Sequence, residues 1–169
     1  MSGALLAGMI EILTIGHSNH GIEGFLRILA KHGVRLLVDL RSEPHSRYAP
    51  QYNRVSLQRS LESAGIDYRY SGASLGGRPK DPALLAPDGK PDYDKIAASE
   101  PFQAELRAIV DLAGRMRLCL MCSEADPMCC HRESVVGRAL RSWGVEVTHL
   151  SPDGMSHGAG GSKPRIESQ

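Results

Sequence analysis

Several features that would place a chain in a functional class at once are scarce in this sequence. Aromatic residues make up only 5% of the 169 residues, and the formal net charge is +1. The sequence therefore has few stacking residues and no overall basic field of the kind that binds nucleic acid. The opening stretch, MSGALLAGMIEIL, is apolar, but it contains no basic residue of the kind that begins a signal peptide, and it is too short to span a bilayer. We interpret it as an extra run ahead of the first strand, with Met9 as an alternative start, and expect a cytoplasmic protein without a membrane partner.

Three sequence signatures of phosphate handling are also missing. GHSNHG, residues 16–21, has the glycine spacing of a phosphate loop, but Ile22 and Glu23 stand where that loop requires lysine and a hydroxyl residue. The dinucleotide motif G-x-G-x-x-G does not occur. A phosphatase-like Cys-x5-Arg motif is absent because Met128 is the sixth residue after Cys122. These absences argue against three common mechanisms and leave other anion-binding and cysteine chemistry open.

All four cysteines lie in one stretch, LCLMCSEADPMCCHRESV, residues 118–135. In a cytoplasmic protein they should be reduced, so we expect no disulfide framework. Cys119 and Cys122 have the spacing of a zinc knuckle, but two positions three apart in a strand point to opposite faces. Cys129 and Cys130 are adjacent, which is unfavourable for two ligands of one tetrahedral ion. The pattern favours Cys119 as a core residue and implies neither a metal nor a cofactor.

Short apolar runs and amphipathic stretches alternate along the chain. The apolar runs predict strands at 11–16, 34–40, 66–70, 117–122 and 145–150, and the helical periodicity predicts helices at about 22–33, within 50–65, from 101 to 113 and from 131 to 143. Such alternation is typical of an α/β fold. We predict a single three-layer domain over residues 9–154, with a mostly parallel sheet of about five strands and flanking helices. An incomplete barrel of βα units is the alternative.

Two segments have no such periodicity. Residues 71–92 contain several glycines and prolines and predict a long irregular segment, which in a compact domain is usually a functional lid or disordered. Residues 155–169 are rich in Gly and Ser, with few apolar side chains, and predict a flexible C-terminal tail. Neither segment is expected to add a strand to the sheet.

Polar and titratable residues follow each predicted strand directly. In an open parallel sheet the carboxyl ends of the strands share one edge, and ligands bind there. We therefore predict one shared site at that edge, formed by GHSN after the first strand, DLRS at the end of the second, LGG after the third and CSE after the fourth. His149, at the end of the fifth strand, lies at the same edge. The run Cys130-His131-Arg132, at a helix start, should form a further wall.

The residue types at this edge suggest two sets of roles. The catalytic candidates are Asp39, Cys122, Glu124, Cys130 and His131. The candidates for binding a substrate anion are His17, Ser18, Asn19, Arg41, Ser42, Arg47, Gly76, Gly77 and Arg132. Because a helix N-terminus lowers a thiol pKa, the predicted position of Cys130 favours a reactive thiol there.

Several of these residues have purely structural interpretations as well. Ser18 and Asn19 could cap the helix that follows them, and Gly76 and Gly77 could form an ordinary turn. Arg47 could belong to a solvated basic loop, and Cys130 and His131 could pack at a helix start after an Asp-Pro turn. An aspartate that ends an apolar strand needs a partner, so a working pair of Asp39 and Arg41 is favoured over a solvated loop.

Six motifs occur in a fixed order over residues 11–154: TIGHSN, LVDLRSEPHSR, YAPQYN, GIDYRYSGASLGG, LCLMCSEADPMCCHR and VTHLSPDG. In these motifs the chain resembles the domain-of-unknown-function 488 (DUF488) family of small prokaryotic proteins. The resemblance implies a compact α/β domain and no particular activity. The family pattern corresponds here to His17, Ser18, Asn19, Asp39, Arg41, Ser42, Pro44, Arg47, Asn53, Leu75, Gly76, Gly77, Cys122, Glu124, Cys130, His131 and Arg132. Cys119 and Cys129 lie outside it, which further disfavours a four-cysteine metal site.

Three functions compete at this point. The first is an enzyme, a hydrolase or transferase, that acts on a phosphorylated or nucleotide-like small molecule held by Arg41 with Arg47 or Arg132. The second is a nucleic-acid-associated binding module, whose binding would weaken steeply with salt. The third is a thiol or metal redox protein that uses Cys122 and Cys130. The substrate, the reaction and the oligomeric state do not follow from the sequence.

Overall fold

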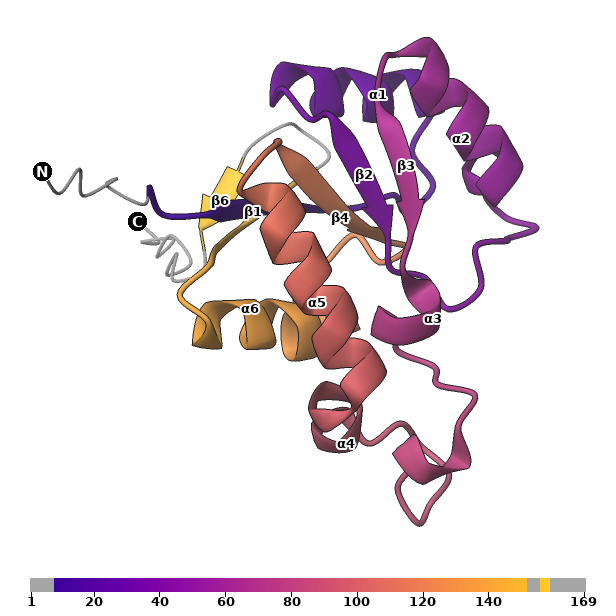
Figure 1. The fold of residues 1–169 in the computed structure, drawn as a ribbon. Coiled ribbons are helices and arrows are strands. Elements are labelled where there is room, and N and C mark those ends of the chain that lie inside the picture. Colours follow the sequence, from indigo (N-terminus) through magenta and orange to yellow (C-terminus); the bar gives the residue numbers. More distant parts are fainter. Residues whose placement is uncertain (1–7, 152–155, 159–169) are drawn as a thin grey trace, which may run out of the picture.

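The computed structural model describes residues 8–151 and 156–158, whose strands form one sheet with helices on both faces (Figure 1). The strands are β1 (Glu11–Gly16), β2 (Leu36–Asp39), β3 (Asp67–Tyr70), β4 (Leu118–Cys122), β5 (Glu146–Leu150) and β6 (Ser156–Gly158). Their order across the sheet is β3-β2-β4-β1-β5-β6, in which β1 to β5 are parallel and β6 is antiparallel to β5. The predicted three-layer α/β fold with a mostly parallel sheet is confirmed. The incomplete-barrel alternative is wrong, because strands that follow one another in a βα barrel are neighbours, whereas here β4 lies between β1 and β2.

The two helical layers come from different parts of the chain. One face of the sheet is covered by α1 (Ile22–Lys31), the 3-10 helix η1 (Pro50–Tyr52) and α2 (Arg54–Ser63). The other face is covered by α3 (Gly72–Leu75), α4 (Tyr93–Ala98), α5 (Glu100–Ala113), the π-helix η4 (Arg132–Gly137) and α6 (Arg138–Ser142). The 3-10 helices η2 (Pro82–Leu84) and η3 (Pro127–Cys129) lie in loops. Figure 1 shows α5 and α6 on the side of the sheet away from α1 and α2.

Alternation along the buried strands produces two separate hydrophobic cores. In β4, Leu118 and Leu120 join the core beneath α5 and α6, whereas Cys119 and Met121 join the core beneath α1 and α2. Because side chains of a strand point alternately to its two faces, a strand buried on both sides reads as a continuous apolar run. The prediction of Cys119 as a core residue is confirmed, since its side chain is fully buried in the second of these cores.

The central position of β4 locates the site. Its chain continues into η4 and α6 on one face, whereas its neighbours β1 and β2 continue into α1 and α2 on the other. At such a switch point the connections part and leave a crevice beyond the strand ends, where ligands bind in open α/β sheets. The register brings Gly16 opposite Cys122, and Asp39 opposite Met121, so the polar residues after these three strands start at the same level.

Two predicted irregular segments are more structured than expected. Residues 71–92 contain α3, η2 and a two-residue bridge between Leu85 and Pro91. The prediction of a tail from residue 155 is wrong for Ser156–Gly158, because this segment pairs with β5 as strand β6. Backbone pairing carries no periodic apolar signal when the segment is so short and lies at an edge. Residues 1–7, which include most of the expected N-terminal run, lie outside the described residues, as do 155 and 159–169, the rest of the expected tail.

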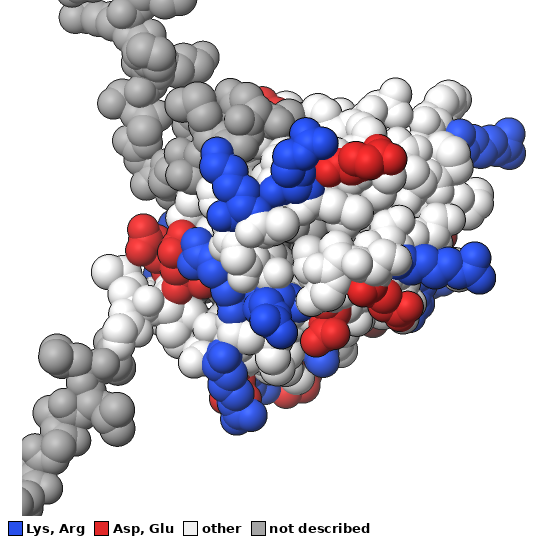
Figure 2. All heavy atoms as spheres, turned by 90° about the horizontal axis from the view of Figure 1, so that it is seen from above, with Lys and Arg blue, Asp and Glu red and all other residues white. Residues whose placement is uncertain are grey.

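The surface of the described residues adds little to a functional assignment. No helix there is both long and apolar enough to cross a membrane. Figure 2 views the molecule from above Figure 1, and lysine and arginine side chains on this face are interspersed with aspartate and glutamate. Neighbouring charges of opposite sign shorten the range of the field that either produces.

Candidate active site

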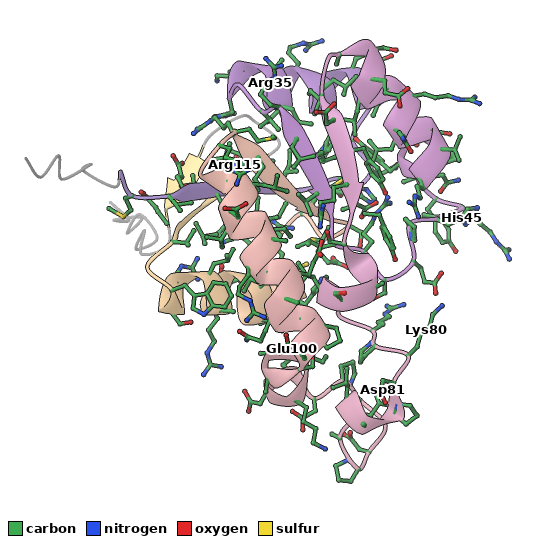
Figure 3. All side chains as sticks on the ribbon, in the orientation of Figure 1. Arg35, His45, Lys80, Asp81, Glu100 and Arg115 are labelled. Atoms are coloured by element: carbon green, nitrogen blue, oxygen red, sulfur yellow. The ribbon has the colours of Figure 1, made fainter. Side chains whose placement is uncertain are left out.

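A cavity of about 590 Å³ opens at the carboxyl ends of β1, β2 and β4. This volume is within the usual range for a small-molecule site. Figure 3 shows His45, one of its lining residues, on the loop after β2, and Arg35 and Arg115 toward the opposite end of the strands. The cavity is lined by His17, Arg41, Ser42, Glu43, His45, Ser46, Tyr48, Gly77, Arg78, Tyr93, Cys122, Ser123, Glu124, Cys129, Cys130 and His131.

One wall is built on a buried ion pair between Arg41 and Asp39. Arg41 donates from Nε to Oδ1 of Asp39 at 2.9 Å and from Nη2 to Oδ2 at 2.8 Å, which is a two-pronged contact. Asp39 also accepts hydrogen bonds from the backbone N–H of Arg41 and from the hydroxyl of Tyr68, and Nη2 of Arg41 reaches the carbonyl of Tyr52. The Asp39 carboxylate is fully buried and accepts four hydrogen bonds, so its lone pairs are occupied.

His17 completes this wall as a neutral imidazole. It is buried and stacks on Tyr52 at a centroid distance of 4.3 Å. Burial lowers its pKa to about 4, and the charge of Arg41 acts in the same direction. The simplest assignment has Nδ1–H donate to the carbonyl of Ser18 at 2.6 Å, and Nε2 accept from Nη1 of Arg41 at 3.3 Å. Arg41 is therefore held on two sides, and within the described part of the chain its Nη1 contacts neither an aspartate nor a carbonyl.

The opposite wall contains a second buried arginine with quite different partners. Arg132 is fully buried, and its Nη1 donates to Sγ of Cys122 at 2.8 Å and to the carbonyl of Glu124. Nη2 donates to the carbonyl of Ala125 at 3.0 Å, and Nε has no hydrogen-bond partner among the described residues. Among the described residues no carboxylate forms an ion pair with Arg132. A buried cation without a carboxylate favours a negative charge on the nearest group that can carry one, which is the Cys122 thiol.

Cys122 and Cys130 form a coupled pair of thiols. Their Sγ atoms are 2.6 Å apart, with Cys130 as the hydrogen donor and Cys122 as the acceptor. The pKa of Cys122 is lowered, first by this hydrogen bond and then by the charge and hydrogen bond of Arg132, which together outweigh burial. The pKa of Cys130 is raised by the same hydrogen bond and by burial. The prediction that the helix start makes Cys130 the low-pKa thiol is wrong, because its proton is held by the neighbouring sulfur.

The other side of Cys130 faces His131. Sγ of Cys130 and Nδ1 of His131 are 3.7 Å apart, and the imidazole lines the cavity. Burial lowers the pKa of His131, so the ring is neutral at neutral pH and can accept a proton. The predicted helix from 131 begins as the π-helix η4, and π-helical turns are frequent at functional sites.

Glycines allow these walls to approach one another. A Cβ atom on Gly16 would lie 1.7 Å from the carbonyl oxygen of Glu124 and 2.8 Å from Nη1 of Arg132. A Cβ on Gly77 would lie 2.9 Å from the ring of His131. Side chains at these two positions would displace the Glu124 backbone, Arg132 and His131. Gly77 therefore serves close packing as well as any turn that it forms.

The structure brings together eight of the predicted site residues and leaves six outside the cavity lining. The lining residues are His17, Arg41, Ser42, Gly77, Cys122, Glu124, Cys130 and His131. Asp39, Gly76 and Arg132 are buried behind them. Ser18, Asn19 and Arg47 do not line the cavity. Capping of α1 by Ser18 or Asn19 is also wrong, because Gly21 is the N-cap residue and no side chain caps this helix.

Several lining residues were missed by sequence reasoning. Arg78 follows the glycine pair directly, and an arginine at this position was the clearest signal in the sequence for a further anion-binding residue. Tyr93 begins α4, whose start is marked by the capping residue Asp92. Tyr48 and His45 come from the loop after β2 and carry no pattern that separates them from ordinary loop residues. Tyr52 and Tyr68, which hold the pair of Arg41 and Asp39, could not be linked to it without the tertiary structure.

The fifth strand end forms a separate polar cluster instead of joining the cavity. Nδ1 of His149 lies 2.5 Å from Oγ1 of Thr14, and its Nε2 lies 2.7 Å from Oε2 of Glu133. Arg141 makes a two-pronged contact with the same Glu133 carboxylate. Thr14 is fully buried, and none of these residues lines the cavity, so the cluster fixes η4 and α6 on the sheet.

Comparisons with known proteins give one match. The family model described as "Domain of unknown function DUF488" matches residues 21–139, which is well over half of the chain. Neither a curated protein nor a solved structure matches the sequence. Among the described residues, no three histidine, cysteine or acidic side chains are grouped closely enough to hold a metal ion.

Proposed function

The chain belongs to the DUF488 family, and we propose that it is an enzyme in which Cys122 attacks a small substrate that bears a phosphate or carboxylate group. The reaction proceeds through a covalent adduct on Cys122, and such an adduct allows group transfer, hydrolysis or thiol–disulfide exchange. The observation that carries the proposal is the contact between Cys122 and Arg132, a buried guanidinium that forms no ion pair with a carboxylate of the described residues. No feature of the described residues favours the nucleic-acid-binding alternative.

The remaining roles follow from position in the cavity. Nη1 of Arg41 and the exposed side chain of Arg78 are the cations available to a substrate anion. Phosphate, as the sequence predicts, and carboxylate both accept hydrogen bonds from a guanidinium group. Glu124 and His131 line the same cavity as Cys122, and we assign proton transfer to them because they are close to it in sequence and share its wall. Asp39 is assigned to holding Arg41, since its oxygens are already occupied.

Alkylation kinetics test this proposal directly. The Cys129→Ser variant removes the exposed thiol and leaves Cys122 as the expected reactive residue. The rate at which iodoacetamide labels Cys122 should depend on pH with an apparent pKa below the ordinary thiol value of about 8.5. At low ionic strength the labelling rate of the anionic reagent iodoacetate should rise relative to that of iodoacetamide. Inorganic phosphate or adenosine monophosphate should slow the labelling if the substrate anion is a phosphate, and acetate should do so if it is a carboxylate. An apparent pKa of 8.5 or above would refute the assignment of Cys122 as the nucleophile.

A further inference from the structure

The cavity contains a second thiol that a carbon or phosphorus electrophile would leave unused. Cys130 is buried, lines the cavity and points its Sγ at that of Cys122. Building on the assignment of Cys122 as nucleophile, we infer that the substrate is a small disulfide with charged ends and that Cys130 resolves the adduct formed on Cys122. The protein would then be a thiol-dependent disulfide reductase for small molecules.

The geometry of the two sulfurs supports a sulfur electrophile. Their separation of 2.6 Å is close to the covalent S–S length of about 2.05 Å, so a bond between them requires little movement. When Cys122 carries a sulfur group from a disulfide, a second thiol beside it can displace that group. When Cys122 carries a phosphoryl or acyl group, attack by Cys130 on Sγ of Cys122 gives no productive release. A neighbouring thiol therefore favours disulfides among the possible substrates.

The reaction balances in two steps. The Cys122 thiolate attacks one sulfur of a disulfide RS–SR′, the Cys122–SR bond forms, and R′S⁻ leaves and takes up a proton. Cys130 then gives up its proton and attacks Sγ of Cys122, the Cys122–Cys130 bond forms, and RSH leaves. The substrate is reduced by two electrons, and the two cysteines are oxidised. A low-molecular-weight thiol or dithiol must reduce the internal disulfide before the next cycle.

His131 is placed to assist the second step. Cys130 needs to lose a proton to attack, and the Nδ1 atom of His131 lies 3.7 Å from its Sγ. The ring is neutral at neutral pH and so can accept that proton. Arg132 contacts Cys122 throughout, since its Nη1 is held by the Glu124 carbonyl, and it favours Cys122 over Cys130 as the attacking thiolate.

The charges of the cavity indicate what the ends of the disulfide carry. Nη1 of Arg41 and the side chain of Arg78 can donate hydrogen bonds to an anionic group, and two carboxylates, Glu43 and Glu124, line the same space. Both signs together complement a zwitterion, in which a carboxylate and an ammonium group are a few bonds apart. Disulfides of amino acids or short peptides have these charges. A cavity of about 590 Å³ is also larger than a peroxide, the other common oxidant of thiols, would need.

Mixed-disulfide trapping tests the inference. The full chain with Cys129→Ser, and the same chain with Cys130→Ser or Cys122→Ser added, are each incubated with glutathione disulfide and analysed by intact mass and peptide mapping. We expect an internal Cys122–Cys130 disulfide and no stable adduct in the first protein. The Cys130→Ser protein should accumulate a glutathione adduct on Cys122, and the Cys122→Ser protein should form neither product. Cystamine, whose ends are only cationic, and hydrogen peroxide serve as comparison oxidants.

The outcomes separate this inference from the proposed function. If Cys122 alkylates with a lowered pKa but never bonds to Cys130, Cys122 stays the nucleophile and the disulfide substrate is wrong. If the adduct forms on Cys130 in the Cys122→Ser protein at an undiminished rate, the order of attack is wrong. Oxidation that is at least as fast with cystamine or peroxide as with glutathione disulfide would overturn the zwitterionic disulfide as substrate. If Cys122 reacts with no reagent, both the inference and the proposed function are refuted.

Discussion

Two buried arginines lie at the same edge of the sheet, and they differ in what balances their charge. Arg41 has the Asp39 carboxylate in a two-pronged contact, and further hydrogen bonds surround the pair. Arg132 has two backbone carbonyls and the sulfur of Cys122. Removing a cation from water costs several kcal/mol, which a carboxylate can offset and a carbonyl offsets only in part. A completed ion pair therefore stabilises the structure around it, whereas a buried cation that lacks a carboxylate lowers the pKa of a neighbouring thiol.

The largest effect should come from breaking the completed pair. Asp39→Asn removes the charge that balances Arg41 and leaves that guanidinium buried and unpaired. We expect the free energy of unfolding to fall by about 3–5 kcal/mol, measured by urea denaturation, because the remaining ion cannot recover its hydration. Asp67→Asn, at an exposed position of β3, is the matched control and should change stability by less than about 0.5 kcal/mol. Equal losses in the two variants would mean that the buried pair does not hold this wall.

The second effect concerns the neutral histidine beside Arg41. The folded-state pKa of His17 is about 4 and its ordinary value is 6.5, so the unfolded chain binds more protons than the folded chain between these values. The stability that a neutral His17 contributes is therefore full above pH 6.5 and is lost as the pH falls toward 4, by about 3 kcal/mol. In the His17→Gln variant the amide oxygen can still accept from Arg41, and the fall in stability between pH 7 and 4 should be smaller. Urea midpoints across this range measure it, and His45→Gln, at an exposed position, should keep the parent slope.

Much of this edge could be predicted from single segments of the sequence. Apolar runs identify β1 to β5, and the polar residues after β1, β2 and β4 fall on one edge because parallel strands end together. Strand alternation alone separates Cys119, in the core, from Cys122, at the cavity. These inferences succeed because they depend on periods of two or 3.6 residues, which are visible within a window of about ten.

The difference between the two arginines could not be predicted in this way. Arg41 and Asp39 are two residues apart, so their pairing is local, but the stabilising contacts of Tyr52 and Tyr68 depend on how η1 and β3 pack. Arg132 forms no ion pair with a carboxylate of the described residues, and this depends on how distant segments pack around it. A local sequence pattern does not show which distant residues stay away. The same holds for the thiols: a helix start predicted a low pKa for Cys130, and the contact with Cys122 across the loop reversed it.

The third effect should come from removing the incomplete partner. Arg132→Met replaces the guanidinium by an apolar side chain of similar length, so Cys122 loses its nearest positive charge. The apparent pKa for iodoacetamide labelling in the Cys129→Ser background should rise from about 7. A rise of one unit lowers the thiolate fraction at pH 7 from about one half to about one eleventh, so the labelling rate at pH 7 should fall at least about 5-fold. Arg132→Lys keeps the charge, so its labelling rate should lie between those of the parent and Arg132→Met. Arg138→Met, at an exposed position, is the control and should keep the parent rate. If the labelling rate is unchanged in Arg132→Met and a thermal melt shows that the protein is folded, Arg132 does not lower the pKa of Cys122.

The smallest effect should come from Arg78, the exposed arginine of the cavity. Arg78 lines the cavity but is exposed, so its charge interacts through water and is screened by salt. Arg78→Ala should reduce the preference of Cys122 for iodoacetate over iodoacetamide about 2- to 3-fold at low ionic strength, with little change at 0.5 M salt, because a rim charge mainly affects the encounter with an anion. Arg59→Ala, at an exposed position of α2 outside the cavity lining, should leave the preference unchanged. Because Arg78 supports neither fold nor thiolate, its loss should not alter the apparent pKa of Cys122, and a shift in that pKa would show that the thiolate depends on the whole cavity rather than on Arg132.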